Sequence, residues 1–169
     1  MAAQTIKTNR LVLRNIKKSD IKNIVYLLKP EIEKFSGPYM PHSKKQLSRH
    51  INKIKGDNAW GITLADGTFI GNMGVFSVVE SKIGEIAWYV DPVYWNNGYA
   101  FEASSAVLKY CFETLGFVRI STQISADNQK SRHLAEKLGF EFHAILPQAN
   151  LGGKITDVAY YSLTAKNKK

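Results

Sequence analysis

Residues 85–106 read EIAWYVDPVYWNNGYAFEASSA, and this stretch carries the strongest structural signal in the chain. Its pattern predicts a strand over residues 85–90, a turn at Asp91-Pro92, a loop over residues 95–98, and then a helix. A loop that leaves a strand and opens a helix directs several main-chain N–H groups toward one point, where the positive end of the helix dipole also lies. This arrangement favours an anion such as a phosphate group. The loop has one glycine and no Lys-Ser or Lys-Thr ending, so it is neither a dinucleotide fingerprint nor a P-loop.

The loop resembles the pyrophosphate-binding loop of the GNAT acyl-CoA N-acyltransferases, whose pattern is (Arg/Gln)-x-x-Gly-x-(Gly/Ala). The matching residues are Trp95-Asn96-Asn97-Gly98-Tyr99-Ala100. One branch of the family, which acetylates the N-terminal amine of ribosomal proteins and includes relatives with small-molecule substrates, is similar over the longer run Tyr94-Trp95-x-x-Gly98-Tyr99-Ala100-x-Glu102-Ala103. Trp95 replaces the basic or amide residue of the wider family, as is usual in this branch.

Two other segments carry the same resemblance. The opening of the branch is similar to Thr8-Asn9-Arg10-Leu11-Val12-Leu13-Arg14, and the family's distal cofactor-side motif is similar to Asn128-x-x-Ser131-x-x-Leu134-x-x-x-Leu138-Gly139-Phe140. The resemblance covers roughly residues 8–163. It implies the GNAT fold, with a mixed and mostly antiparallel sheet.

Hydrophobic periodicity predicts an α/β protein with about seven strands and about four helices. Strands are expected over residues 10–14, 59–64, 69–79, 83–90, 119–124, 140–146 and 156–163. Helices are expected after Asp20, after Ser43, after the phosphate loop, and over residues 131–138, whereas residues 31–42 are expected to be irregular. Hairpin turns are expected at residues 66–67 and 152–153, and Gly71 and Gly74 indicate a bulge or a close backbone approach. We expect one domain over residues 1–169, with its core over 8–163 and a basic tail over 164–169.

The composition limits the location and the partners of the protein. The net charge of +9 favours anionic partners, for which the phosphates of coenzyme A, ribosomal RNA or an acidic substrate would each suffice, and it also serves solubility. No apolar run approaches the roughly 20 residues that span a membrane, and the N-terminus has no apolar signal core. The single cysteine, Cys111, lies on an apolar helical stripe and is predicted to be part of the core. We therefore expect a cytoplasmic protein, monomeric or homodimeric, without a membrane partner.

Several other classes of site are disfavoured. The four histidines have no metal-ligand spacing, there is no G-x-S-x-G hydrolase motif, and no interleaved aromatic and basic motif predicts specific nucleic-acid binding. Within the irregular segment, His42 is a weak candidate for the acceptor site. The aromatic residues Phe35, Tyr39, Trp60 and Tyr160 are either acceptor-site residues or, for most of them, core.

The resemblance implies that acetyl-CoA is the cofactor. By position, the N–H groups of Asn96, Asn97, Gly98, Tyr99 and Ala100 would hold its pyrophosphate, and Gly98 would allow close approach because it has no Cβ. In the family the strand before this loop separates from its neighbour and pairs with the pantetheine arm. That role falls on the backbone of Trp88 and Val90, with the Val90 N–H as oxyanion donor. Ordinary sheet packing is the alternative for both residues.

Glu85 is the candidate general base, acting through water. It lies five residues before Val90, where the branch carries a strand glutamate, and burial among apolar neighbours would raise its pKa toward the working range. An exposed or salt-bridged residue is the alternative. An α-amino group has a pKa of about 8 and a lysine about 10.4, so one relayed carboxylate is better suited to an N-terminal amine.

The chain lacks the residue that many members of the family use as the acid for the leaving thiolate. Many members of the family use a tyrosine at the position that is Ala135 here. Ser131 is a candidate replacement, with helix capping as its alternative, and Asn128 is predicted to bond the pantetheine amide or to form an Asx turn.

Together these observations predict an acetyl-CoA-dependent N-acetyltransferase that acts by direct attack in a ternary complex. The predicted acceptor is a protein N-terminal α-amine of ribosomal-protein type. The alternatives are a small amine such as an antibiotic, a polyamine or an amino acid, a CoA-binding sensor without turnover, and a basic RNA-binding module.

Overall fold

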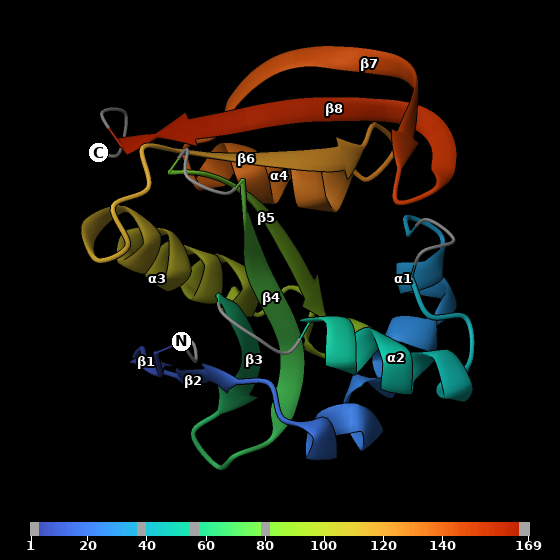
Figure 1. Cartoon of the computed structure of the whole chain (residues 1–169), viewed down its shortest axis with the longest axis vertical. Coiled ribbons are helices and arrows are strands. Elements are labelled where there is room, and N and C mark those ends of the chain that lie inside the picture. Colours follow the sequence, from blue (N-terminus) through green and yellow to red (C-terminus); the bar gives the residue numbers. More distant parts are fainter. Residues whose placement is uncertain (1–3, 37–39, 55–57, 79–81, 166–169) are drawn as a thin grey trace.

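The computed structural model describes residues 4–36, 40–54, 58–78 and 82–165 (Figure 1). Two of the predictions concern residues outside these ranges, namely Tyr39 and the lysines of the predicted basic tail from residue 166 onward.

Eight strands form one sheet in the order β1-β2-β3-β4-β5-β6-β8-β7. Neighbouring strands are antiparallel except β5 and β6, which are parallel, so the sheet is mixed and mostly antiparallel, as predicted. The strands are β1 (Ile6–Lys7), β2 (Leu11–Asn15), β3 (Ala59–Leu64), β4 (Phe69–Val78), β5 (Ile83–Val90), β6 (Arg119–Ser125), β7 (Glu141–Leu151) and β8 (Lys154–Thr164). All seven predicted strands are present, and the two-residue strand β1 was not predicted. Because β8 continues to Thr164, residue 164 belongs to the sheet and not to a tail.

The α-helices are α1 (Pro30–Glu33), α2 (Lys44–Ile54), α3 (Tyr99–Glu113) and α4 (Gln129–Lys137). Short 3-10 helices cover η1 (Lys18–Lys22), η2 (Ile24–Leu28) and η3 (Pro92–Tyr94). The helix predicted after Asp20 is therefore wrong as an α-helix. The buried Asp20 carboxylate accepts bonds from the Arg14 guanidinium and the Lys17 N–H, which fixes a tight turn, and Val25 of the predicted apolar face is 36% exposed. The segment predicted to be irregular begins with the single turn α1, which has Pro30 at its first position.

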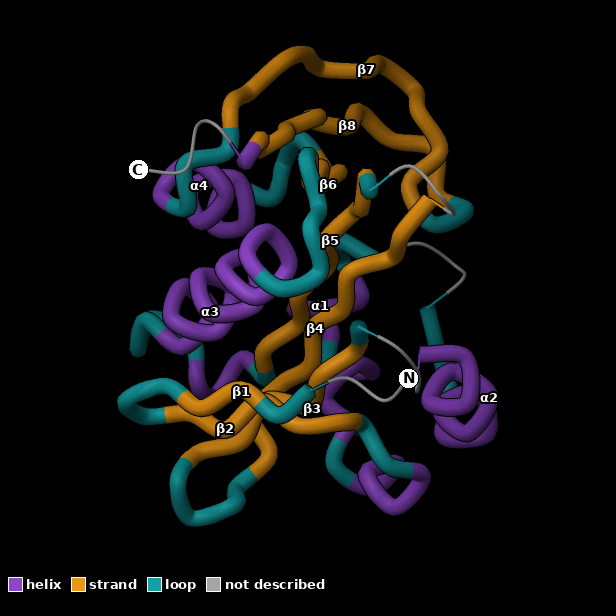
Figure 2. The backbone as a smooth tube through the Cα atoms, turned by 60° about the vertical axis from the view of Figure 1, so that its left-hand side comes forward, coloured by secondary structure: helices purple, strands orange, loops and turns teal. Residues whose placement is uncertain are grey.

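Helices cover both faces of the sheet (Figure 2). On one face, Ile86 and Val90 of β5 pack against Val107, Leu108 and Cys111 of α3, in a core that also includes Ala135 of α4. On the other face Tyr89 packs against a second cluster that comes from η2, α1 and α2. Side chains alternate along a strand, so successive residues of β5 contribute to opposite layers. Cys111 is buried and burial raises the pKa of its thiol to about 12, which confirms it as a core residue.

At Gly71 the backbones of β4 and β5 approach each other closely. Gly71 pairs with Val90 across β4 and β5, beside a register shift between Ile62 and Thr63 of β3. A Cβ at Gly71 would lie 2.4 Å from the Tyr89 carbonyl oxygen, which confirms the predicted close backbone approach at this glycine. Gly74 differs, because a Cβ there would make only ordinary contacts of 3.5 Å or more.

Candidate active site

A cleft of about 980 Å³ opens where β5 leaves β6. The two strands pair only from Ile83 to Glu85, opposite Arg119 to Ser121, after which β6 continues beside β8 while β5 descends away from it (Figure 1). The cleft is lined by residues 85–90 of β5, 122–125 of β6, 127–131 around the start of α4, and most of residues 94–101 in the loop before α3. On the far side of the sheet it reaches α1 and the turn between β7 and β8.

The free edge of β5 turns its main-chain groups into this cleft. The Asp91 N–H donates to the Ile70 carbonyl 2.9 Å away, so the main-chain groups of residue 91, and by alternation those of residue 89, face β4. The main-chain groups of Trp88 and Val90 therefore face the opposite way, toward the gap that β6 has left, where the Val90 carbonyl accepts from the Trp95 indole N–H at 2.7 Å. Both residues also pack into the core with their side chains, as the alternative predicted, and this packing is compatible with the predicted pairing of their main-chain groups.

The loop between β5 and α3 presents a row of main-chain donors. Asn96 and Gly98 both have left-handed backbone conformations, with φ of 64° and 77°, and Gly98 is the N-cap residue of α3. The main-chain N–H groups of residues 96–101 donate to no acceptor within the described part of the chain. These free donors lie at the positive end of a 15-residue helix, and the left-handed conformation at residue 98 is one that glycine adopts readily. The loop therefore fits a diphosphate.

Glu85 lies at the junction where the two strands part. Burial raises the pKa of its carboxyl group, and a hydrogen bond from the Gln123 side chain, 3.2 Å from Oε2, works in the opposite direction. The carboxyl is half-buried and lines the cleft. It also lies close enough to Tyr89 that its charge, after burial, contributes to raising the pKa of the Tyr89 hydroxyl. A carboxylate with a raised pKa in a cleft is suited to accept a proton near neutral pH.

Two other predicted residues meet across the cleft. The Trp88 indole N–H donates to the Ser131 hydroxyl at 2.9 Å, which leaves the hydroxyl's own hydrogen without an acceptor among the described residues. Asn128 is the N-cap residue of α4, because its side-chain oxygen accepts the Ser131 N–H at 3.2 Å. The capping role therefore belongs to Asn128, and Ser131 is free to act through its hydroxyl.

The remaining predicted residues are placed as follows. Asn96, Gly98, Tyr99 and Ala100 line the cleft. The Asn97 side chain bonds back to the carbonyl oxygens of Tyr94 and Trp95, within its own loop. Phe35 lines the far end of the cleft. Three weaker candidates lie elsewhere: His42 pairs with Glu33, Trp60 is buried, and Tyr160 stacks near His143.

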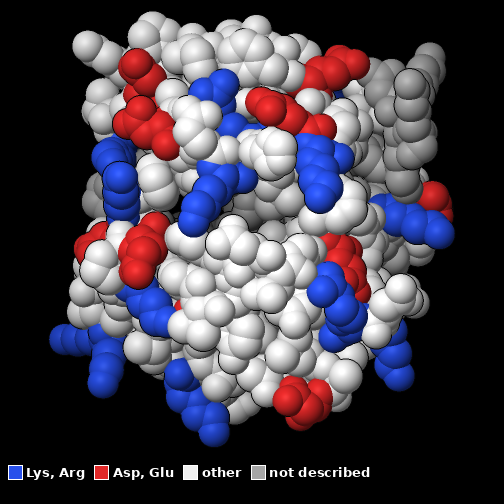
Figure 3. Space-filling model, turned by 180° about the vertical axis from the view of Figure 1, so that it is seen from behind, with Lys and Arg blue, Asp and Glu red and all other residues white. Residues whose placement is uncertain are grey.

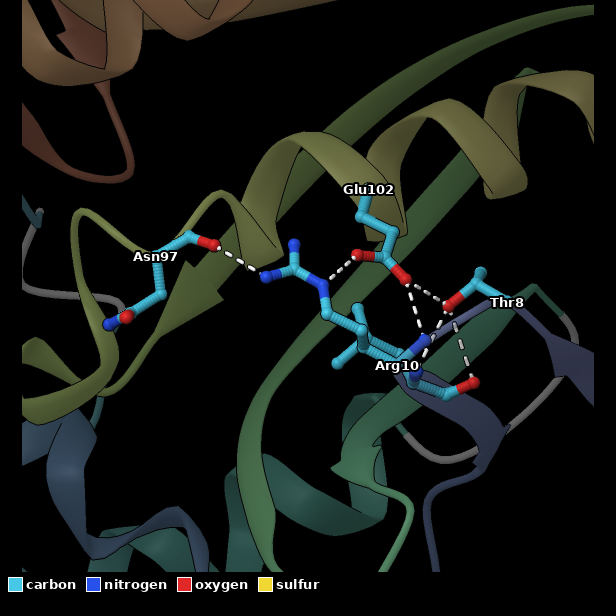
Figure 4. Close-up of polar contacts among 5 residues, drawn as sticks. Thr8, Arg10, Asn97 and Glu102 are labelled. Atoms are coloured by element: carbon cyan, nitrogen blue, oxygen red, sulfur yellow. Dashed lines mark hydrogen bonds and ion pairs between the residues drawn. The ribbon is translucent and has the colours of Figure 1, made fainter.

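The sequence did not predict several residues that contact the predicted site residues. Gln123 reaches Glu85 from β6, and a group formed by Thr8, Arg10 and Glu102 contacts the phosphate loop (Figure 4). Thr8, Arg10 and Glu102 all belong to segments that carry the family resemblance, but the resemblance alone does not bring them together. Lys130 also lies over the Trp95 ring, 4.6 Å from its centroid, so a positive charge stands at the loop.

The positive charge of the molecule is distributed. On the face shown in Figure 3, Lys and Arg side chains are interspersed with Asp and Glu around a broad uncharged middle. A dispersed charge of this kind gives long-range attraction to anions and does not form the continuous basic stripe of a nucleic-acid track on that face. Among residues 4–36, 40–54, 58–78 and 82–165, no group of three or more His, Cys, Asp or Glu side chains could hold a metal ion. None of the helices in the same ranges has the length and apolar character that a membrane crossing requires.

Comparisons with known proteins agree with this geometry. Residues 10–141 match the family model described as an acetyltransferase (GNAT) domain. The uncharacterized N-acetyltransferase YoaA of Bacillus subtilis is 30% identical over 152 residues, which cover 85% of this chain and 86% of YoaA.

Solved structures share the fold. The crystal structure of a GNAT-family acetyltransferase from Bacillus anthracis superposes with a TM-score of 0.87 at 24% identity, covering 96% of this chain and 99% of that one. RimL, a ribosomal L7/L12 alpha-N-protein acetyltransferase solved in complex with coenzyme A, superposes with a TM-score of 0.81 at 19% identity, covering 95% and 98% of the two chains. By its matching domain, its relatives and its fold, the chain belongs to the GNAT family of acetyltransferases, enzymes whose acetyl donor is acetyl-CoA.

Proposed function

We propose that this acetyltransferase acetylates the α-amine of a protein N-terminus by direct attack in a ternary complex. The observation that carries the proposal is the parting of β5 from β6 immediately after Glu85. It places a half-buried carboxylate, a strand edge that β6 no longer covers and the free N–H groups of the phosphate loop along one cleft.

The cofactor side of the cleft is built from main-chain donors. The N–H groups from Asn96 to Ala100 would hold the diphosphate at the start of α3, and the free edge at Trp88 and Val90 would pair with the pantetheine arm. Bound acetyl-CoA supplies an activated acyl carbon. The Val90 N–H, which faces the gap, is then the donor that stabilises the negative charge developing on the acyl oxygen.

Two side chains account for the protons. As the amine nitrogen bonds to the acyl carbon, Glu85 accepts a proton from it through water, and the carbon–sulfur bond breaks. The Ser131 hydroxyl, which accepts the Trp88 indole N–H, would donate a hydrogen bond to the departing sulfur and keep its own proton. A thiol has a pKa of about 8.5, so the sulfur can leave as a thiolate and take its proton from water afterwards.

The acceptor class is supported by the strength of the base. An α-amino group with a pKa of about 8 needs roughly tenfold deprotonation at pH 7, whereas a lysine with a pKa of about 10.4 needs more than a thousandfold. One carboxylate acting through water meets the first demand better. The likeness in fold to RimL, which acts on a ribosomal-protein N-terminus, agrees with this class.

A small amine is the second candidate acceptor, and one contact favours it. The Lys154 ammonium, beside the turn between β7 and β8, donates to the Lys34 carbonyl at 3.0 Å. This bond joins the hairpin to the end of α1 across the acceptor side of the cleft, where Leu151 and Gly152 contribute to the lining. A cleft narrowed in this way suits a compact amine, whereas a protein acceptor could enter only as a single extended chain end.

The test is thiol release from acetyl-CoA, corrected for hydrolysis, with a panel of N-terminal peptides and small amines. We expect the highest kcat/KM for peptides with a free α-amine, and no turnover for the same peptides when that amine is already acetylated. Higher kcat/KM for a polyamine, amino acid or aminoglycoside would establish the second candidate instead. Saturable acetyl-CoA binding in calorimetry without turnover on any acceptor would contradict both.

A further inference from the structure

The peptide bond between Asn97 and Gly98 is held from behind by a side chain of the N-terminal segment. Arg10 Nη1 donates to the Asn97 carbonyl at 3.0 Å, and Arg10 Nε donates to Glu102 Oε2 at 2.7 Å (Figure 4). The same guanidinium lies over the Tyr99 ring, 4.7 Å from its centroid. Arg10 thus connects the phosphate loop to the first turn of α3.

The Glu102 carboxylate is in turn fixed by the turn before β2. Its Oε1 accepts from the Thr8 hydroxyl at 2.6 Å and from the Arg10 N–H at 3.0 Å, and its side chain is 18% exposed. Burial favours the neutral acid, but the hydrogen bonds from Thr8 and Arg10 outweigh it and lower the pKa of Glu102. The carboxylate is therefore charged at neutral pH and holds the guanidinium in one orientation.

A trans peptide bond directs its C=O and its N–H in opposite directions, and no described peptide bond is cis. Because Arg10 holds the Asn97 carbonyl on one side of the loop, the Gly98 N–H points to the other side. Gly98 lines the cleft, whereas among the described residues that form the cleft wall neither Arg10 nor Glu102 occurs. The guanidinium therefore acts on the far side of the loop from the ligand.

We propose that Arg10 is a positioning residue that holds the Gly98 N–H toward the cleft and so preorganises the loop for the diphosphate of acetyl-CoA. The proposal rests on the cofactor role given above to residues 96–100. Glycine readily changes its backbone conformation, so a loop centred on Gly98 needs an external contact to remain in one orientation. A loop that is already oriented loses less free energy on binding.

Simple charge attraction is the competing explanation, and the two make opposite predictions for Glu102. If Arg10 attracts phosphate only through its charge, then Glu102→Gln, which removes a negative charge near the loop, should strengthen binding. If Arg10 orients the peptide bond, the same variant should weaken binding because the guanidinium loses its anchor. Arg10→Lys separates the two further, since it keeps the charge but loses the planar fork of donors.

The experiment measures the Kd of coenzyme A by calorimetry for the wild type, Arg10→Ala, Arg10→Lys and Glu102→Gln. We expect all three variants to bind at least about tenfold more weakly, the effect of one hydrogen bond to a charged group. The matched control is Arg14→Ala, which removes a guanidinium from the same strand region that is paired with Asp20 and not with the loop. It is expected to bind coenzyme A with a Kd within about twofold of the wild type.

A second measurement uses S-acetyl-pantetheine, a donor that lacks the diphosphate. We expect Arg10→Ala to lower kcat/KM with acetyl-CoA about tenfold and to leave kcat/KM with S-acetyl-pantetheine unchanged within about twofold. An equal loss of kcat/KM with both donors, or tighter coenzyme A binding by Glu102→Gln, would overturn the positioning role of Arg10 and leave the cofactor site itself unaffected. Absence of coenzyme A binding to the wild type would instead overturn the cofactor site on which the proposal rests.

Discussion

The Glu85 carboxyl lies where it can act as a base, and its burial there also lowers the stability of the folded protein when it is ionised. We expect Glu85→Gln to lower kcat by about 100-fold or more, the usual contribution of general base catalysis. The Kd of acetyl-CoA should change by less than about twofold, because the cofactor side of the cleft is made of main-chain donors. Steady-state kinetics with the best acceptor and calorimetry with acetyl-CoA give the two numbers. A loss of affinity equal to the loss of turnover would show that Glu85 supports the cleft and is not the base.

The pH dependence of the same variant follows from the sign of its pKa shift. Because burial raises the pKa of Glu85, wild-type kcat should fall as the pH is lowered through that raised value, and Glu85→Gln should lack this limb. Ionisation is also harder in the folded state than in the unfolded state, where the pKa is near 4.5. Above that pH the ionised carboxylate therefore destabilises the fold, so Glu85→Gln should be more stable than wild type at pH 8 and equal to it at pH 4. Urea unfolding at both values checks this, and a less stable variant at pH 8 would contradict it.

The role of a single residue can be predicted from the sequence when that role depends on its neighbours along the chain. Glu85 is recognisable as a carboxylate within an apolar strand, and Gly98 as the glycine that opens a helix. The roles of Gln123 and Arg10 cannot be recognised in this way, because each hydrogen-bonds to a residue that is distant in sequence. Gln123 donates to Glu85, 38 residues away, and Arg10 donates to Glu102, 92 residues away. Local pattern contains no information about those contacts.

At the scale of the strands, the position of Val90 depends on how closely β4 approaches β5. A Cβ at Gly71 would lie 2.4 Å from the Tyr89 oxygen and 3.1 Å from the Val90 Cα. We expect Gly71→Ala to destabilise the protein by about 1–3 kcal/mol, as overpacking does, and to lower kcat by displacing the Val90 N–H. Gly74→Ala is the control, since a Cβ there has room in the same strand. Chemical denaturation and kcat are the measurements. Equal kcat for the two variants would mean that the Val90 N–H is not needed for turnover.

The elements themselves were predictable where alternation or helical periodicity is strong. The strands from β2 to β6 and helices α2, α3 and α4 lie close to their expected ranges. The structure of the segment after Asp20 was not predictable, because an apolar pattern does not distinguish an α-helix from two 3-10 turns. Here the buried ion pair between Asp20 and Arg14 holds the 3-10 turns in place. Two-residue β1 is likewise set by its pairing with β2, since two residues are too few to show a period.

At the scale of the whole molecule, the cleft exists because the sheet is interrupted between β5 and β6. Periodicity predicts both strands but not their pairing, since α3 separates them in the chain and only Ile83 to Glu85 of β5 pair with β6. The resemblance to the family, and not the pattern of residues, supplied the expectation that these strands separate. The consequence is that a ligand in the cleft contacts both β5 and β6, whose side chains share one core cluster, and should stabilise that cluster as a unit.

Cys111 provides a means of measuring that stabilisation. It is the single cysteine of the chain, it is fully buried in the core between α3 and the sheet, and its thiol has a pKa of about 12. At pH 8 it should therefore react with a maleimide only when the core opens. Acetyl-CoA at about 100 times its Kd adds about 2.7 kcal/mol to the free energy of unfolding, so labelling should slow by about 100-fold when opening and closing are faster than the reaction. Mass spectrometry of the protein follows the rate, and Arg10→Ala at the same acetyl-CoA concentration should show less slowing. If acetyl-CoA binds but the labelling rate does not change, the thiol is reached by a local opening of α3 that leaves the cleft intact, and ligand binding is not coupled to the opening of the core around Cys111.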